Sequence, residues 1–134
     1  MIEMNKGTAV RPLVKLARII FVVLAWLFLA FIASQIFIAG LGLFVDSDNW
    51  ELHKSLPQNF SFVPLVMLAA AFLGKLPVHI RWICLGLFLM VVAQFLTVIF
   101  SSDIGMLSAL HPVIAMLLFW GSLTTVKHGH KWRK

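Results

Sequence analysis

Four long apolar stretches, separated by short polar segments, make up most of the chain. They cover roughly residues 16–45, 49–74, 82–100 and 104–126. At ~1.5 Å rise per residue, about 20 helical residues cross a ~30 Å hydrocarbon core, so each stretch predicts a membrane-spanning helix. Only helices and closed barrels satisfy their backbone groups in lipid. The pattern therefore predicts an all-α, four-helix transmembrane bundle, up-down-up-down, forming a single integral membrane domain over residues 1–134.

Prolines and polar residues predict where these helices start and bend. Residues 1–14 form a mixed polar lead with Pro12 just before the first span. The segment Asp48-Asn49-Trp50-Glu51 fits a capping box, which places a helix start at Asp48 and His53 in the second turn. Pro57 and Pro64 predict that the second span is kinked or divided.

The second half of the chain repeats the plan of the first. Gln35 precedes His53 by 18 residues, and Gln94 precedes His111 by 17, each pair spanning a short acidic turn. Ser101-Ser102-Asp103 predicts a turn and an N-cap, with the fourth helix starting near Ile104 and His111 about two turns in. A two-helix internal repeat would pack around a pseudo-twofold axis along the membrane normal.

Composition supports a bilayer as the main partner. Hydrophobic residues make up 61% of the chain and charged residues 12%, against about 25% charged in a soluble domain. The net charge of +6 does not indicate nucleic acid, because the basic residues lie in short flanks beside the apolar stretches. The single cysteine, Cys84, lies inside an apolar stretch and cannot form an internal disulfide.

The basic residues also predict an orientation. Lys and Arg cluster before the first span, between the second and third, and after the fourth, whereas the other side carries only Lys54. Four of the five acidic residues lie on that other side: Asp46, Asp48, Glu51 and Asp103. The positive-inside rule then predicts a multi-pass protein of the cell membrane with both termini in the cytoplasm.

His53 and His111 are the leading candidates for chemistry. In the predicted bundle the second and fourth helices are parallel and diagonal, so the two imidazoles would meet across the core at similar depth. This arrangement predicts bis-histidine ligation of haem b. Gly40 and Gly42 would either let the first helix approach its neighbour closely or make room for a macrocycle. The aromatic residues expected around it are Phe37, Phe44, Phe95 and Phe100.

Other interpretations of these residues stay open. The two histidines are equally compatible with ordinary interfacial residues of a non-enzymatic structural or accessory membrane protein, and zinc or copper would lack a third closely spaced ligand. Gln35 and Gln94 would bind a cofactor, a quinone or a histidine nitrogen, or would hydrogen-bond between helices, which is the favoured interpretation.

Three further histidines lie on the side assigned to the cytoplasm. His79 falls between Lys75 and Arg81 in a small basic patch, and His128 and His130 have the H-x-H spacing of a weak metal site or of a solvated tail. The sequence contains no Ser-His-Asp set, HExxH, P-loop or GxGxxG motif, so it predicts no particular catalytic activity.

The motif QxFxAGxGxF at residues 35–44, W-x-x-H at 50–53 and Leu110-His111 together resemble a family of small uncharacterised four-helix bacterial membrane proteins. The resemblance covers about residues 16–126. The layout is also similar to one half of haem A synthase, in which paired histidines of the second and fourth helices ligate haem. That resemblance implies His53 and His111 as the pair. The chain departs from it in lacking an outer-loop cysteine pair and in carrying Pro57 within the second helix.

Overall fold

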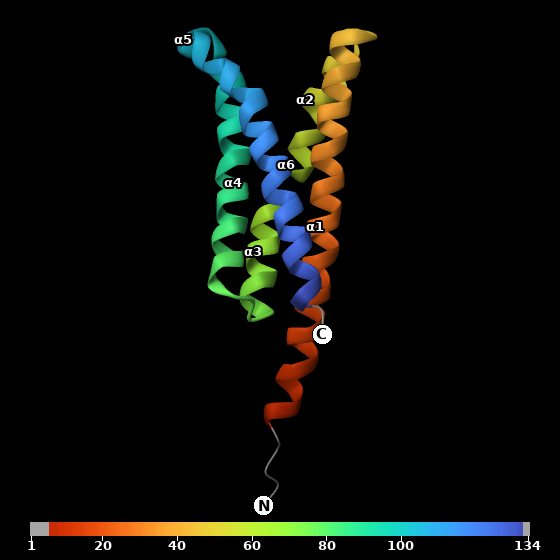
Figure 1. The fold of residues 1–134 in the computed structure, drawn as a ribbon, viewed down its shortest axis with the longest axis vertical. Helices are drawn as coiled ribbons and strands as arrows, with labels where there is room; N and C mark the ends of the chain where they lie inside the picture. The colour runs from red at the N-terminus through yellow and green to blue at the C-terminus, as the bar shows by residue number, and fades with distance from the viewer. Residues whose placement is uncertain (1–5, 133–134) are drawn as a thin grey trace, which may run out of the picture.

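The computed structural model describes residues 6–132, and it shows helices joined by short turns (Figure 1). In chain order the elements are α1 (Lys6–Phe44), α2 (Asn49–Phe60), α3 (Val63–Leu73), α4 (Val78–Ile99), α5 (Ser101–Ile104), the 3-10 helix η1 (Gly105–Ala109), α6 (Leu110–Gly129) and the 3-10 helix η2 (His130–Trp132). Four segments are long and apolar enough to cross a membrane: Pro12–Phe44, Asn49–Leu73, Val78–Ile99 and Ser101–Gly129. The predicted all-α bundle of four membrane-spanning helices is confirmed.

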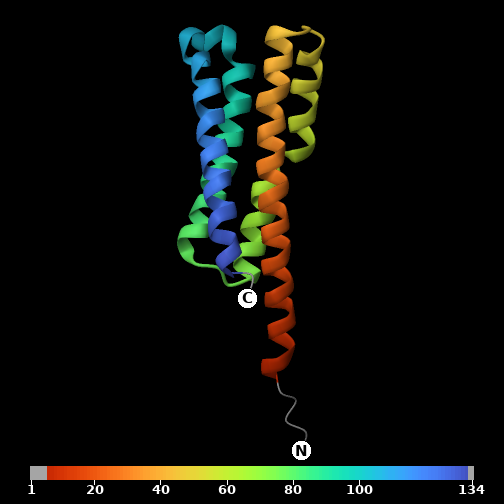
Figure 2. The ribbon, with the colours of Figure 1, turned by 45° about the vertical axis from the view of Figure 1, so that its right-hand side comes forward.

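The four spans form a ring in which each packs beside its chain neighbours. Helix α1 packs against α2, α3 and α6, and α4 packs against α3 and α6. Within residues 6–132, neither diagonal pair, α1 with α4 or α3 with α6, forms a comparable interface. Figure 2 shows the start of α1 and the end of α6 at the same end of the bundle, as an up-down-up-down order requires.

The two ends of the bundle differ in charge. We call one the acidic end, because it carries the exposed residues Asp46, Asp48, Glu51 and Asp103 in or beside its two turns. The other is the basic end, where α1 begins, α6 ends and the turn between α3 and α4 lies; it carries Lys75, Arg81, Lys127 and Lys131. Helix α1 extends beyond the other helices at the basic end (Figure 1).

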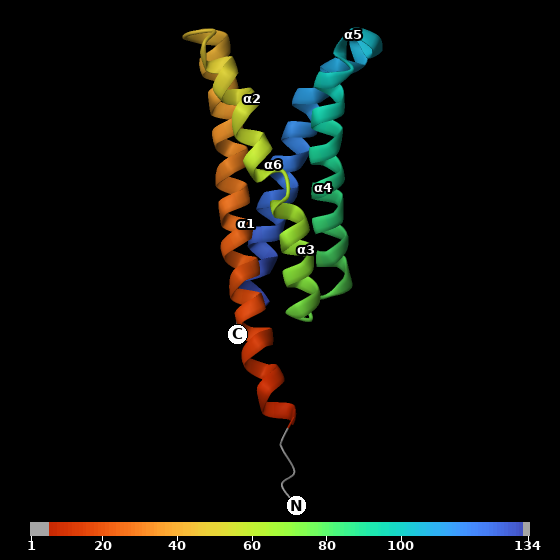
Figure 3. The same cartoon turned by 180° about the vertical axis from the view of Figure 1, so that it is seen from behind.

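The hydrophobic core lies in the basic half. Its large, fully buried side chains come from α1, α3 and α4 and from the turn between the last two: Phe21, Phe28, Met67, Leu76, Ile80 and Leu87. Cys84 is buried among them, as its apolar surroundings predict. By contrast, no residue of α2 is buried. The α1–α2 and α4–α6 ribbons also diverge toward the acidic end (Figures 1 and 3).

Prolines divide the second span as predicted. Helix α2 ends at Phe60 and α3 begins at Val63, with Pro64 in its first turn, where a missing N–H leaves no hydrogen bond unmade. Pro57 lies inside α2 and cannot donate to the carbonyl four residues earlier, which belongs to His53. The His53 carbonyl therefore lacks the helical hydrogen bond that residue 57 would otherwise donate.

The predicted helix start at Asp48 is confirmed, since Asp48 is the N-cap residue of α2, but the predicted capping-box hydrogen bond is not formed. The Asp48 side chain makes no capping hydrogen bond, and α2 begins at Asn49. Asp46 organises the turn instead: its Oδ1 accepts from the Asp48 N–H at 2.9 Å, and its carbonyl accepts from the Asn49 side-chain amide at 2.9 Å. Asp46 competes for the local donors two residues before the predicted cap.

The predicted starts of the other three spans shift. Helix α1 begins at Lys6 and carries Pro12 inside it, so most of the predicted polar lead is helical, while residues 1–5 lie outside the described residues. The third span begins at Val78, directly after Pro77, rather than near residue 82. Regular helix in the fourth span begins at Leu110, after α5 and η1, rather than at Ile104. Pro112 thereby falls in the first turn of α6, where proline is tolerated.

Candidate functional site

The structure brings His53 and His111 together between the diverging arms. Their ring centroids are 6.4 Å apart and their planes meet at 66°. His53 lies in the second turn of α2 and His111 in the first turn of α6, and both side chains are half-buried. The two helices make no extensive interface with each other in the described part of the chain, so the histidine pair is a local contact between two otherwise separate arms.

His53 is oriented by the backbone of α1. Its Nδ1 lies 3.1 Å from the carbonyl oxygen of Gln35. Because a carbonyl only accepts hydrogen bonds, the Nδ1 of His53 carries the proton and donates it. In the neutral ring, Nε2 of His53 then carries a free lone pair.

His111 is oriented through a hydroxyl on α4. Its Nδ1 lies 2.9 Å from Thr97 Oγ1, and the Thr97 hydroxyl donates to the Gln94 carbonyl at 2.8 Å. The single hydroxyl proton is used in that second bond, so Thr97 Oγ1 accepts from Nδ1–H of His111. The Nε2 atom of His111 is again the basic nitrogen.

The two rings therefore share one tautomer. Among residues 6–132, neither Nε2 of His53 nor Nε2 of His111 makes a hydrogen bond, whereas both Nδ1 atoms are engaged. Metal-ligating histidines show this arrangement, in which the outer ring nitrogen donates to an oxygen and the inner one stays free for the metal. The pair can thus present two neutral nitrogen ligands.

Gln35 and Gln94 contribute to the site in an unexpected way. Their backbone carbonyls, rather than their side chains, are the oxygens at the base of the two histidine contacts. The Gln35 side chain is 8% exposed, and neither its Nε2 nor its Oε1 has a hydrogen-bond partner among the described residues; the same holds for Gln94 Oε1. The predicted interhelical hydrogen bonds of these amides are therefore not formed.

The two glycines of α1 have different surroundings. A Cβ at Gly42 would lie 2.8 Å from Trp50 Cε2, so Gly42 is where the Trp50 indole packs on α1. That indole lies 5.5 Å from the His53 ring at 90° and supports its orientation. A Cβ at Gly40 would meet no atom within 4 Å. Gly42 thus provides close approach rather than room for a macrocycle.

Most of the predicted aromatic pocket does not form. Phe37 and Phe44 are 67% and 87% exposed on α1, and Phe100 is 48% exposed. Phe95 alone of the four packs against the core. Helical periodicity could have shown this for Phe37, because it lies two residues from the buried Gln35 and so on another face of α1.

Thr97 is the site residue that sequence reasoning missed. It follows Gln94 by three residues, the spacing at which a threonine hydroxyl reaches back to a backbone carbonyl of its own helix. Nothing in that spacing indicated a histidine from another helix.

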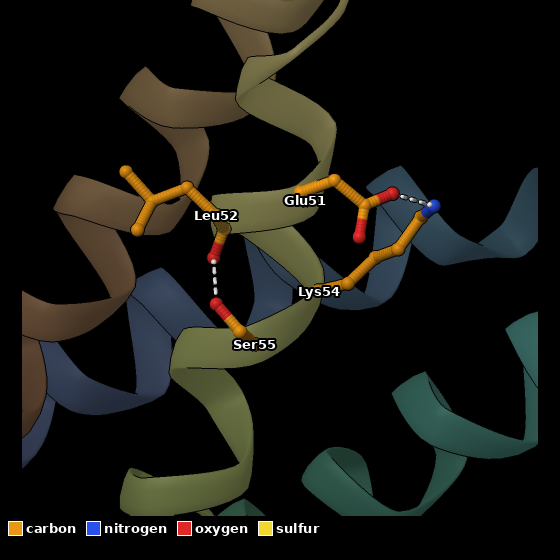
Figure 4. A network of polar contacts seen from close by, with 4 residues as sticks. All are labelled: Glu51, Leu52, Lys54 and Ser55. Atoms are coloured by element: carbon orange, nitrogen blue, oxygen red, sulfur yellow. Dashed lines mark hydrogen bonds and ion pairs between the residues drawn. The ribbon is translucent and has the colours of Figure 1, made fainter.

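The exposed surface of α2 carries a separate set of polar contacts. Lys54 and Glu51 form a 2.9 Å ion pair there, and the Ser55 hydroxyl donates to the Leu52 carbonyl (Figure 4).

Across residues 6–132, no group of three or more His, Cys, Asp or Glu side chains is placed to hold a metal ion. The His53–His111 pair therefore offers two protein ligands. A four-coordinate protein zinc site needs three or four. An iron porphyrin needs only two, because the macrocycle supplies the other four nitrogens.

Residues 35–100 match the model of a family of unknown function, DUF6220. The matched segment begins at Gln35 and includes His53, Gln94 and Thr97, while His111 lies beyond it. The expected likeness to an uncharacterised family is confirmed to that extent. No curated protein and no solved structure matched the chain, so the similarity to haem A synthase stays a prediction.

Proposed function

We propose that the protein is a small integral membrane protein that binds haem b through His53 and His111, for electron transfer or haem handling. The observation that supports this most strongly is the geometry of the pair. The ring centroids lie 6.4 Å apart, both Nδ1 atoms are hydrogen-bonded, and among the described residues neither Nε2 atom has a hydrogen-bond partner. A bound haem would supply a one-electron iron couple. The protein's part is to hold both imidazoles in one tautomer at a fixed separation.

The ring separation suits two ligands of a single iron. Since imidazole nitrogens bind metal ions at about 2.0 Å, two imidazoles on opposite sides of one ion would have ring centres about 6 Å apart. The observed 6.4 Å is close to that value.

The surroundings of the pair also suit a ligand. The acidic half has little core of its own: α2 has no buried residue, and the two arms make few contacts there within the described chain. The buried Gln35 amide and Gln94 Oε1 lack partners, and an unpartnered buried amide is costly in an apolar environment. Both belong to the residues whose carbonyls hold the histidines. A polar group on a bound molecule would relieve that cost.

We further propose that the basic end faces the cytoplasm of the cell. Lys75, Arg81, Lys127 and Lys131 lie there, and the described acidic residues lie at the other end. The positive-inside rule then places the His53–His111 pair near the outer face of the cell membrane.

The proposal is tested by the visible spectrum of protein purified from haem-replete cells. We expect a Soret band typical of six-coordinate iron. In His53→Ala and in His111→Ala this band should either change to that of iron with one ligand fewer or disappear. His130→Ala is the matched control, because the His130 ring accepts from Trp26 Nε1 at 3.3 Å at the basic end. A colourless wild-type protein under these conditions contradicts the proposal.

One observation favours a purely structural role. The His53 contact joins α2 to α1, and the His111 contact joins α6 to α4, so each histidine also connects neighbouring helices. In a structural protein, either alanine variant would lower the stability of the haem-free protein by about 1 kcal/mol, the usual value of one hydrogen bond. Added haem would then leave the melting temperature unchanged. Melting with and without haem separates the two roles.

A further inference from the structure

A groove opens at the basic end, where α3 and α4 pack side by side (Figure 3). Its volume is about 250 Å³, and it is lined by Leu68, Phe72, Val78, Arg81, Trp82 and Leu85. The lining residues of α3 are one turn apart, and those of α4 have the spacing of a single helix face. Phe72, Val78 and Trp82 are exposed, so the groove faces the surroundings of the bundle rather than its core.

Arg81 is the one charged residue of this groove. Its guanidinium carbon lies 4.5 Å from the centre of the Phe72 ring, a cation–π contact that uses none of its N–H donors. The Nε atom of Arg81 is buried and has no hydrogen-bond partner among the described residues. A buried donor without an acceptor is costly, and the cost is larger on a charged group. The groove therefore presents a donor that a bound acceptor would satisfy.

The charge at the basic end favours an anionic acceptor. Lys75 lies in the turn between α3 and α4, and Lys127 lies in the last turn of α6. The described acidic residues all lie at the other end, so no carboxylate of residues 6–132 is placed to pair with Arg81. A phosphate group matches the planar fork of an arginine side chain and can accept two of its hydrogen bonds.

The depth of the groove matches that of a phospholipid. Arg81 and Trp82 lie near the start of α4, where this membrane span begins, and tryptophan is typical of the headgroup level. Leu85 lies seven residues after Val78, which is ~10 Å further along the helix at ~1.5 Å per residue. A headgroup held at Arg81 would thus leave an acyl chain running inward along apolar side chains.

We propose that this groove binds one anionic phospholipid, with its phosphate on Arg81 and an acyl chain along Leu68 and Leu85. Basic pockets between membrane helices recognise acidic headgroups in this way. A zwitterionic headgroup fits less well, because its own cation is repelled by Lys75 and Arg81. The groove and the His53–His111 pair lie at opposite ends of the bundle, so the inference goes beyond the proposed haem site and does not depend on it.

The test is a lipid titration of the full-length protein in detergent, with bound lipids counted by native mass spectrometry. Phosphatidylglycerol is compared with phosphatidylcholine of the same acyl chains, and we expect one tightly bound phosphatidylglycerol. Arg81→Gln should weaken its binding by about 10–100-fold, as for the loss of a hydrogen bond from a charged group. Arg81→Lys keeps the charge without the planar fork and should bind with intermediate affinity.

Two further variants separate the groove from the general charge of the basic end. Leu85→Trp fills the groove without changing any charge and should also weaken phosphatidylglycerol binding. Lys127→Gln is the matched control, because it removes one exposed positive charge from α6, outside the groove, and should leave the binding unchanged. Circular dichroism confirms that each variant is folded.

Three outcomes overturn the inference. The first is equal binding of the two lipids, or unchanged phosphatidylglycerol binding in Arg81→Gln. The second is an equal loss in Arg81→Gln and Lys127→Gln, because the attraction then belongs to the basic end as a whole. The third is displacement of the lipid by inorganic phosphate together with normal binding in Leu85→Trp, because Arg81 then binds a phosphate group without any acyl chain in the groove.

Discussion

The two halves of the bundle orient their histidines with different acceptors. In the first half, His53 donates directly to the backbone carbonyl of Gln35. In the second, His111 donates to the Thr97 side chain, which passes the hydrogen bond on to the carbonyl of Gln94. Nearly equal Gln-to-His spacings thus give a direct hydrogen bond in the first half and a hydrogen bond through a hydroxyl in the second. The first contact does not depend on any side chain but histidine, and the second depends on a hydroxyl.

The placement of proline goes with this difference. In the first half, the helical break follows the histidine, since Pro57 lies four residues after His53 and α2 ends at Phe60. In the second half, the irregular segment precedes the histidine, because η1 ends at Ala109 and Pro112 lies directly after His111. The irregular segment thus follows the histidine in the first half and precedes it in the second. Equal spacing in sequence therefore does not mean equal local geometry.

Replacement of Thr97 should give the largest effect. Thr97→Val removes the acceptor of His111 while preserving side-chain shape, and we expect haem affinity to fall by about 10–100-fold, as for other partners of a ligating histidine. Hemin titration of the haem-free protein measures the affinity. Thr97→Ser is the control and should retain affinity. Unchanged affinity in the valine variant would show that the relay does not orient His111.

The glycines of α1 test the first half alone. A Cβ at Gly42 would lie 2.8 Å from the Trp50 indole, so we expect Gly42→Ala to destabilise the protein by about 1–2 kcal/mol through overpacking. Gly40→Ala meets open space and should be neutral or stabilise by up to about 1 kcal/mol through helix propensity. Unfolding in detergent measures both. Equal effects at the two positions would contradict the packing of Trp50 on Gly42.

The buried amides provide a smaller test that reaches both halves. Gln35→Leu keeps the carbonyl that holds His53 but removes an amide with two unpartnered buried atoms, so haem-free protein should become more stable by roughly 1 kcal/mol. Gln94→Leu removes only one such atom and should stabilise less. Thermal melts of haem-free protein measure the difference. Destabilisation by Gln35→Leu would mean that the amide makes a stabilising contact.

The smallest effect is expected on the outer surface of α2. Lys54 and Glu51 form their ion pair with side chains 62% and 82% exposed, and Asp103 has no counterpart ion pair among the described residues of the second half. Exposed pairs contribute about 0–1 kcal/mol, so Glu51→Gln should change stability by less than roughly 0.5 kcal/mol. A larger change that vanishes at high salt would show that this asymmetry matters.

Much of the fold could be predicted because the bilayer imposes it. Apolar length gave the four spans, proline gave the division of α2 from α3, and alternating charge gave two unlike ends. Cap hydrogen bonds and some helix starts were less predictable, because Asp46 rather than Asp48 organises its turn and because Pro112 shifts regular helix to Leu110. These outcomes depend on competition among neighbouring donors and acceptors, which a spacing rule does not resolve.

At the candidate site, the sequence predicted the meeting of His53 and His111 but not what orients them. Topology and depth were sufficient for the meeting, since both residues lie in the first two turns of helices that start at the same end. The carbonyl acceptors could not be found from residue type, because every residue has a carbonyl. The Gln side chains suggested interhelical hydrogen bonds, whereas the backbone carbonyls of these residues form the contacts. The role of Thr97 depends on how α4 is rotated relative to α6, which the sequence does not specify.

The contacts of the last turns of α6 bear on how the chain assembles during synthesis. Gly129 packs near Phe21 and Val22 of α1, and His130 accepts a hydrogen bond from Trp26. The first of the four described spans is thus covered by the end of the fourth. Until those turns are in place, the α1 surface around Phe21 is not covered by α6. Placement of these final turns closes the ring of four spans, so a chain that ended before them would leave the Phe21 side of α1 without its cover.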